Sequence, residues 1–221
     1  MGKFEIKEDG KVEFVKSLFK HGRDAGCIVV SPKFPFVLSG GEDGTLTWQP
    51  FDDRSSSLKS VQLLKRKVLA AHLFKVRNEG IATDGQSIIR FSLKSSELLN
   101  QRKLGAAYPQ FADISSDGTR VAVSYGRELQ LFDAEKGQLQ KSFESPEMIW
   151  SALFHPTQPW MISGGRGQAT IWDLESAERL AVLDAGSIQY VSNLAVTADG
   201  SRLALIPSSA GRSIKVFDLT K

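Results

Sequence analysis

Short apolar stretches that alternate with polar residues recur along the whole chain, and turn residues separate them. The clearest unit is residues 161–176, MISGGRGQATIWDLES, in which an apolar run reaches a glycine-rich turn and a second alternating run ends in Trp172 and Asp173. Alternation with a period of two residues, bounded by turn residues, predicts two β-strands joined as a hairpin. No segment shows a sustained 3.6-residue period, so we expect essentially no helix.

The strand that closes this unit has counterparts at regular intervals. Five such strands end in an aromatic residue, at Trp48, Phe91, Phe132, Trp172 and Phe217. The steps between consecutive endings are 43, 41, 40 and 45 residues. A fainter copy ends 42 residues before the first, at Ile6. A period of roughly 40–45 residues with several short strands per unit is typical of a β-propeller.

The Trp-Asp pair that ends the clearest unit resembles the signature of the WD-repeat family. Members of that family with a complete signature carry a His, a Ser or Thr, an Asp and the closing Trp in each repeat, and these four side chains form a buried hydrogen-bond network. The matching residues of the first unit are, in order, His21, Ser39, Asp43 and Trp48. The other units keep fewer of them. The resemblance implies an all-β propeller of about five blades, each a four-stranded antiparallel sheet.

The repeats predict that residues 1–221 form a single propeller domain made of successive units. We place the units at 21–58, 59–101, 102–141, 142–183 and 184–221, after two N-terminal strands within residues 1–20. WD-repeat propellers typically close by pairing an N-terminal strand with the last blade, so the resemblance implies that Val12–Phe19 pairs with Ile214–Leu219. Two alternatives stay open, a closed ring of five blades or part of a larger ring that another chain completes by oligomerisation.

Composition and cysteine content indicate the cellular compartment. The chain has 28 Lys and Arg against 25 Asp and Glu, a mildly basic balance with a formal net charge of +3. No apolar run approaches the roughly 18 residues that span a bilayer, so we expect no membrane partner. Cys27 is the only cysteine, which excludes an internal disulfide and fits a reducing compartment. We therefore expect the cytoplasm, with the nucleus as the alternative.

Residues that carry catalysis or bind metals are scattered along the sequence. His21, His72 and His155 lie in three different units without the spacing of metal ligands, and one cysteine cannot form a thiolate site. The chain has no glycine-rich phosphate loop ending in Lys and Ser or Thr. We therefore expect a protein that is not an enzyme, with no cofactor and no metal; a propeller enzyme is a less supported alternative.

One face of the predicted propeller is our candidate partner site. It combines the turns between the second and third strands with the loops that precede each inner strand. Arg and aromatic residues, the types enriched at interface hot spots, occur in these loops. The candidate residues are Glu42, Arg127, Trp150, Arg166, Tyr190 and Arg212. We predict a non-catalytic protein–protein interaction scaffold within a multiprotein complex.

Positive charge near the junction of the first two units supports an alternative function. The candidate basic patch, within residues 59–77, consists of Lys65, Arg66, Lys67, Lys75 and Arg77. The adjacent Arg102 and Lys103 are a further source of positive charge for it. Such a patch can contact the phosphates of RNA or DNA, which would indicate a nucleic-acid-associated assembly factor. A solvated outer strand, whose charges discourage pairing with other chains, explains the patch as well. We favour the solvated strand, so nucleic acid is not the favoured partner.

Overall fold

The computed structural model describes most of the chain. The described residues are 2–6, 12–17, 21, 24–30, 36–50, 58–74, 77–104, 108–208 and 213–220, with the backbone alone for 2–6, 12–17 and 36. These residues form strands and turns and no helix. No helix of the described part is therefore long and apolar enough to cross a membrane.

Five consecutive sheets make up the body of the molecule, and each is formed by neighbouring antiparallel strands in chain order. Blade one contains β3 (Ala25–Val30), β4 (Phe36–Gly41), β5 (Thr45–Pro50) and β6 (Lys59–Gln62). Blade two contains β7 (Ala70–Leu73), β8 (Glu79–Thr83), β9 (Ser87–Ser92) and β10 (Leu98–Lys103). Blade three contains β11 (Phe111–Ile114), β12 (Arg120–Tyr125), β13 (Glu128–Asp133) and β14 (Leu139–Glu144). Blade four contains β15 (Ser151–Phe154), β16 (Trp160–Gly164), β17 (Gln168–Asp173) and β18 (Arg179–Asp184), and blade five contains β19 (Val191–Val196), β20 (Arg202–Pro207) and β21 (Lys215–Asp218).

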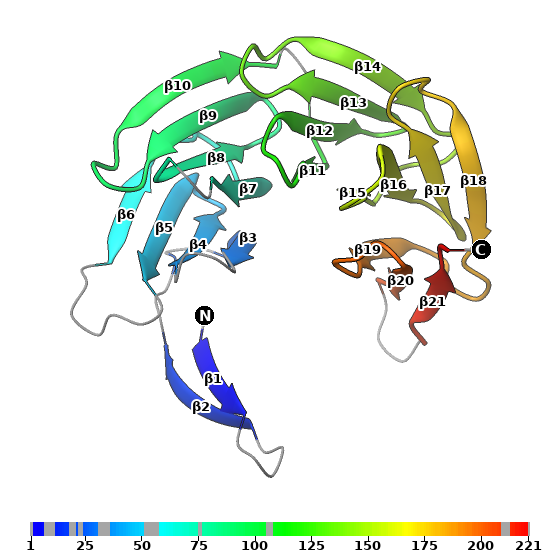
Figure 1. The fold of residues 1–221 in the computed structure, drawn as a ribbon, viewed down its shortest axis with the longest axis horizontal. Coiled ribbons are helices and arrows are strands. Elements are labelled where there is room, and N and C mark those ends of the chain that lie inside the picture. Colours follow the sequence, from blue (N-terminus) through cyan, green and yellow to red (C-terminus); the bar gives the residue numbers. More distant parts are fainter. Residues whose placement is uncertain are drawn as a thin grey trace.

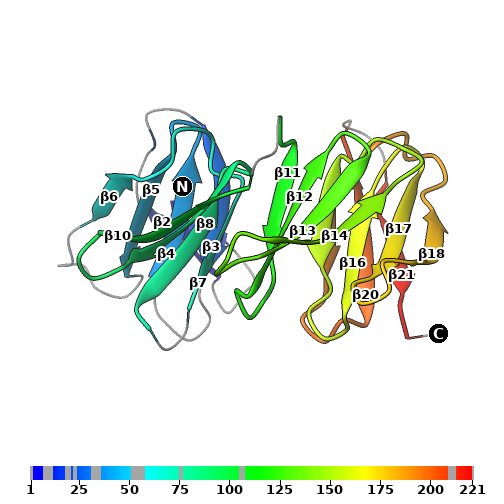
Figure 2. The same cartoon turned by 90° about the horizontal axis from the view of Figure 1, so that it is seen from above.

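The blades stand side by side around a common axis. Figure 1 shows the first strand of each blade on the concave side of an arc and the outer strands β6, β10, β14 and β18 on the convex side. Seen from above, the sheets are stacked face against face (Figure 2). The predicted fold class, an all-β propeller of four-stranded antiparallel blades, is confirmed; blade five is three-stranded.

The hydrophobic core lies between the blades. Trp48 of blade one packs against Phe91 of blade two, with ring centroids 5.5 Å apart, and both side chains are buried. Phe143, on the outer strand of blade three, likewise packs against Trp172 of blade four, with centroids 6.0 Å apart. A single four-stranded sheet cannot cover its own apolar faces, and burial of apolar area contributes roughly 25 cal/mol per Å². Contact between blades is therefore what holds the arc together.

The structure differs from the predicted ring closure. Strand β1 (Gly2–Ile6) pairs with β2 (Val12–Ser17) as a separate two-stranded sheet, and β21 pairs with β20 alone among the described strands. The expected pairing of residues 12–19 with 214–219 is therefore absent from the described part. Figure 1 gives the reason: the blades form an open arc, so β21 lies far from β2. The arc does not form a closed ring of five blades.

The hydrogen-bonded sheets also shift the unit boundaries. The strand at residues 59–62 pairs with β5 and therefore belongs to blade one, although the repeat pattern placed it in the second unit. Similarly, β10 extends to Lys103 in blade two. Blades are delimited by pairing between strands, which a period along the sequence does not specify.

Candidate partner face

The turns between second and third strands lie at the same end of the blades as the loops that precede the inner strands. Backbone hydrogen bonds join each such loop to the turn of the preceding blade. The N···O pairs are Val68–Gly41 (3.0 Å), Leu104–Gln86 (2.8 Å), Ile149–Gly126 (2.8 Å) and Val191–Gly165 (3.1 Å). We call this end of the blades the loop face. Because its loops are tied across blades, the loop face is a preorganised surface.

Three of the predicted partner residues meet on the loop face, and we call them the aromatic group: Trp150, Arg166 and Tyr190. The rings of Trp150 and Tyr190 are in edge-to-face contact, with centroids 5.4 Å apart. Arg166, in the β16–β17 turn, forms an isolated antiparallel bridge with Tyr190. Trp150 remains 44% exposed despite these contacts. Residues about 40 positions apart in the sequence thus form one amphipathic surface across blades four and five.

The remaining predicted partner residues lie apart from the aromatic group. Arg127, in the turn between β12 and β13, donates from Nε to the Ser145 carbonyl at 3.2 Å. Glu42 lies in the turn of blade one and pairs with Lys67, with 3.5 Å between Oε1 and Nζ. Arg212 lies outside the described residues.

Sequence reasoning missed two exposed side chains on this face. Met148, two residues before Trp150, is 41% exposed, and Tyr108, in the loop before β11, is 84% exposed. A large apolar or aromatic residue in a loop that precedes an inner strand was the available signal. It was not sufficient, because exposure depends on the neighbouring blade.

The predicted basic patch is divided by the structure. Lys65 and Arg66 are exposed in the loop before β7, on the loop face, and Lys67 of the same loop faces Glu42. Arg77 follows β7 and precedes β8, and therefore lies at the opposite end of blade two. Lys75 lies outside the described residues. Antiparallel neighbours turn at each strand end, so residues that are close in sequence on either side of a strand lie on opposite faces.

Comparison with known proteins supports the repeat assignment. Residues 12–47 and 137–173 match the family model described as WD domain, G-beta repeat. The predicted resemblance to the WD-repeat family is confirmed at these two segments. A 100-residue stretch, 45% of this WD-repeat chain, is 28% identical to the U3 small nucleolar RNA-associated protein 15 homolog of Bos taurus and spans 19% of that protein.

Among solved structures, a chain in the crystal structure of the mitotic checkpoint complex is similar to this WD-repeat chain. The TM-score is 0.71 over 88% of this chain and 62% of that chain, at 13% identity. At this identity the likeness concerns the fold. This WD-repeat chain spans less than two thirds of the length of either relative.

The polar network of the WD-repeat family is partly present in blade one. His21 Nε2 lies 2.5 Å from Ser39 Oγ, and the Asp43 carboxylate accepts the Thr45 N–H at 2.9 Å. This backbone hydrogen bond lowers the pKa of Asp43. The Trp48 indole instead donates to the Leu93 carbonyl of blade two, at 3.1 Å.

In blade four the indole of the closing residue, Trp172, forms its hydrogen bond within the same blade. Trp172 Nε1 donates to Ser163 Oγ at 2.8 Å, and both side chains are buried. The closing residues of this WD-repeat chain thus join strands within one blade in one repeat and join adjacent blades in another.

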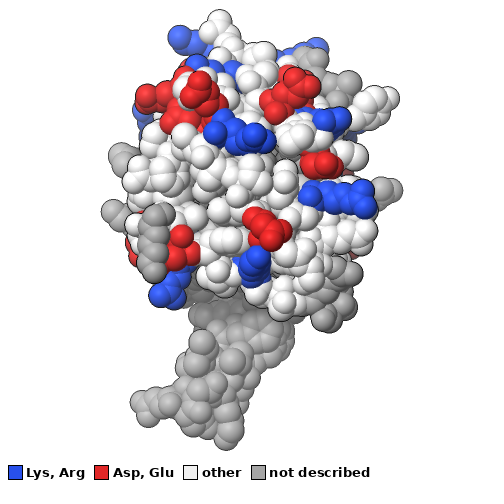
Figure 3. Space-filling model, turned by 90° about the vertical axis from the view of Figure 1, so that its right-hand side faces the viewer, with Lys and Arg blue, Asp and Glu red and all other residues white. Residues whose placement is uncertain are grey.

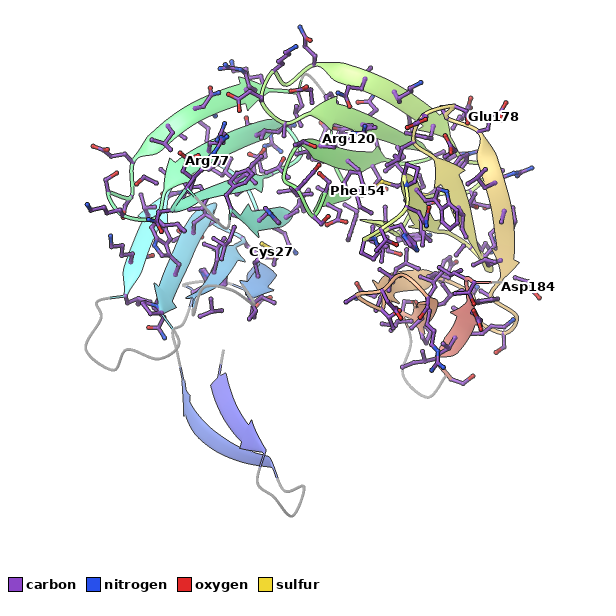
Figure 4. The ribbon with its side chains drawn as sticks, in the orientation of Figure 1. Cys27, Arg77, Arg120, Phe154, Glu178 and Asp184 are labelled. Atoms are coloured by element: carbon purple, nitrogen blue, oxygen red, sulfur yellow. The ribbon has the colours of Figure 1, made fainter. Side chains whose placement is uncertain are left out.

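The concave side of this WD-repeat arc carries two groups with raised pKa values. Burial raises the pKa of the Cys27 thiol to about 11, and Cys27 lies on the inner strand of blade one (Figure 4). Burial also raises the pKa of Asp113, to about 6, although its carboxylate accepts the Phe154 N–H at 2.9 Å. The described residues contain no group of three or more His, Cys, Asp or Glu side chains arranged to hold a metal.

Proposed function

We propose that this WD-repeat chain is a non-catalytic scaffold that binds other proteins through its loop face within a multiprotein complex. The observation that carries the proposal is the aromatic group. Trp150 is exposed, stacks edge-to-face on Tyr190, and sits beside the exposed Arg166. Trp, Tyr and Arg are the residue types that dominate interface hot spots. Their backbones are tied across blades, so binding requires little ordering of the surface.

The chemistry of the described residues supports a binding role rather than catalysis. The thiol of Cys27 has a raised pKa and is therefore a weak nucleophile at neutral pH. The other residue with a strongly raised pKa on the concave side, Asp113, accepts a backbone N–H from the neighbouring blade. This contact is structural. We infer that the protein acts by holding partners together.

The name of the bovine relative supports a proposal about the kind of complex and the cellular compartment. That protein is described as associated with a small nucleolar RNA. We therefore propose an RNA-containing complex as the setting and favour the nucleus over the cytoplasm expected from composition. The second candidate function, a nucleic-acid-associated assembly factor, is supported by the exposed Lys65 and Arg66 on the loop face.

Quantitative affinity purification tests the scaffold proposal. The tagged chain of residues 1–221 is compared with Trp150→Ala and with a matched control, Leu180→Ala, whose side chain is 49% exposed on the outer strand β18. Loss of a hot-spot residue costs about 2 kcal/mol, so retained partners should fall roughly thirty-fold for Trp150→Ala and remain unchanged for Leu180→Ala. Equal recovery from both variants would exclude the aromatic group as the binding site. Ribonuclease treatment separates partners held by protein contact from partners held by RNA.

A further inference from the structure

A hollow of about 470 Å³ opens between blades one and two, beside the loop face. Its lining comes from three segments: the loop before β7, the turn between β8 and β9, and the end of β10. The lining residues are Lys65, Arg66, Asp84, Gln86, Ser87, Gln101 and Lys103. Side chains with amide, hydroxyl or charged ends make up the whole lining, so the hollow suits a polar ligand.

Backbone pairing holds these side chains in place. In the β9–β10 register, Lys103 lies opposite Ser87 and Gln101 opposite Ile89. Successive side chains of a strand point to opposite faces, so Gln101 and Lys103, two positions apart, share a face. The loop with Lys65 and Arg66 is tied on both sides, since Leu64 N–H donates to the Gly44 carbonyl (3.3 Å) and Val68 N–H to the Gly41 carbonyl (3.0 Å).

The charge of the hollow is positive. Lys65, Arg66 and Lys103 are exposed, and none of them forms an ion pair with a described residue. The single carboxylate of the lining, Asp84, is buried and accepts the N–H groups of Gln86 (2.9 Å) and Ser87 (2.7 Å). The outer surface over β18 differs, because positive and negative side chains are interspersed there (Figure 3). The hollow is thus a local concentration of positive charge that no described carboxylate neutralises through an ion pair.

An exposed aromatic residue lies in the loop that follows β10, the strand whose end lines the hollow. Tyr108 is 84% exposed and has a left-handed backbone, with φ of 57°. The next residue, Pro109, packs on the turn between β8 and β9: a Cβ added to Gly85 would lie 2.3 Å from Pro109 Cβ. Gly85 stands between Asp84 and Gln86 of the lining, so this contact brings the backbone that carries Tyr108 near the hollow. A non-glycine residue in the left-handed region is uncommon, and such residues gather at binding sites.

We propose that the hollow and Tyr108 bind single-stranded nucleic acid. Lys65, Arg66 and Lys103 contact consecutive phosphates, and an unpaired base stacks on the Tyr108 ring. A positively charged groove combined with an exposed aromatic is the arrangement that binds single strands with little sequence preference. A duplex keeps its bases stacked inside and leaves the ring without a partner. This inference rests on the second candidate function, the nucleic-acid-associated factor, and names its ligand and its site. The site shares no residue with the aromatic group, so it fails or holds independently of the scaffold function.

Fluorescence anisotropy with labelled twelve-nucleotide oligo(U), oligo(dT) and a duplex of equal length tests the proposal on the full chain. Three phosphate contacts give a slope of log K against log [KCl] of about −2 for a single strand. The triple variant Lys65→Ala/Arg66→Ala/Lys103→Ala should bind at least tenfold more weakly at 50 mM KCl, with a slope near zero. Tyr108→Ala should weaken binding by about tenfold without changing the slope, and Tyr108→Phe should bind as the parent chain does.

Two controls make the result specific. Lys94→Ala/Lys136→Ala/Arg179→Ala removes the same charge from exposed positions elsewhere and should bind normally. Lys65→Arg/Lys103→Arg retains the positive charge and should bind with the same affinity and the same salt dependence as the parent chain. Equal binding of oligo(U) and oligo(dT) assigns recognition to phosphate and base stacking, whereas stronger binding of oligo(U) adds a contact to the 2′-hydroxyl. Absence of binding, preference for the duplex, or equal loss in both triple variants would overturn the proposal.

Discussion

The hydrogen bond between Trp172 and Ser163 allows the role of the closing Trp to be measured. The indole N–H donates to Ser163 Oγ at 2.8 Å, and the two residues are 4% and 3% exposed. A buried polar group that loses its partner costs about 1–3 kcal/mol. Ser163→Ala leaves the indole N–H without its acceptor, so it should lower the free energy of unfolding by that amount. Trp172→Phe should cost about 2–4 kcal/mol, because it also removes ring volume packed against Phe143.

The double variant Trp172→Phe/Ser163→Ala removes donor and acceptor together. It should therefore be less destabilised than the sum of the single variants, by about 1 kcal/mol or more. Urea unfolding followed by circular dichroism measures the four proteins, provided that the dependence of the free energy on urea stays constant among them. Ser39→Ala, which changes a buried serine of blade one, is the matched control and should be additive with Trp172→Phe within about 0.5 kcal/mol.

The reasoning is refuted by a coupling energy indistinguishable from zero for the Trp172–Ser163 pair. It is also refuted by an equal coupling energy for Trp172 with Ser39. Either result would mean that burial of the ring, rather than its hydrogen bond, explains the closing Trp of blade four.

Three further predictions concern a carboxylate, a glycine and the thiol. Burial raises the pKa of Asp113 to about 6, so the folded state retains the proton of this carboxyl between pH 4 and 6 while the unfolded chain releases it. The free energy of unfolding should therefore fall as pH rises through this window. In urea melts at different pH values, Asp113→Asn should abolish this trend. Gly80→Ala should lower the free energy of unfolding by about 1–3 kcal/mol in the same melts, because the added Cβ would lie 2.3 Å from Phe91 Cζ. Gly165→Ala should be nearly neutral, because its added Cβ would meet no atom closer than 3.4 Å. Since the pKa of Cys27 is raised to about 11, iodoacetamide at pH 7.5 should alkylate the folded protein at least tenfold more slowly than the urea-unfolded chain, as followed by mass spectrometry; equal rates would contradict the burial of the thiol.

Local patterns in the sequence were enough for the fold class. Alternating apolar residues, turn glycines and the recurring aromatic ending specify short strands joined by hairpins, and the five endings lie in β5, β9, β13, β17 and β21. These signals are properties of four to eight consecutive residues, so no distant contact is needed to recognise them. The approximately constant period then indicates a stack of similar units.

The partner face was only partly predictable. The sequence identified Trp150, Arg166 and Tyr190 as members of the same set of loops, and the structure shows that they touch across two blades. Exposure of Met148 was not visible in the sequence. Which loop residues meet depends on the packing of one sheet against the next, and no pattern within a single repeat contains that information.

Sequence alone therefore determined the all-β class, the repeat and the strand order, because each follows from neighbouring residues. Tertiary structure decided the open arc, the separate hairpin at the N-terminal end, and the partner of the Trp48 indole in the next blade. It also separated Arg77 from Lys65, and it placed Lys103, which the sequence offered only as an addition to the patch, in the same hollow as Lys65. The physical reason is common to all of these: they are contacts between sheets, and strand register and blade packing place residues that are distant in sequence within reach of one another.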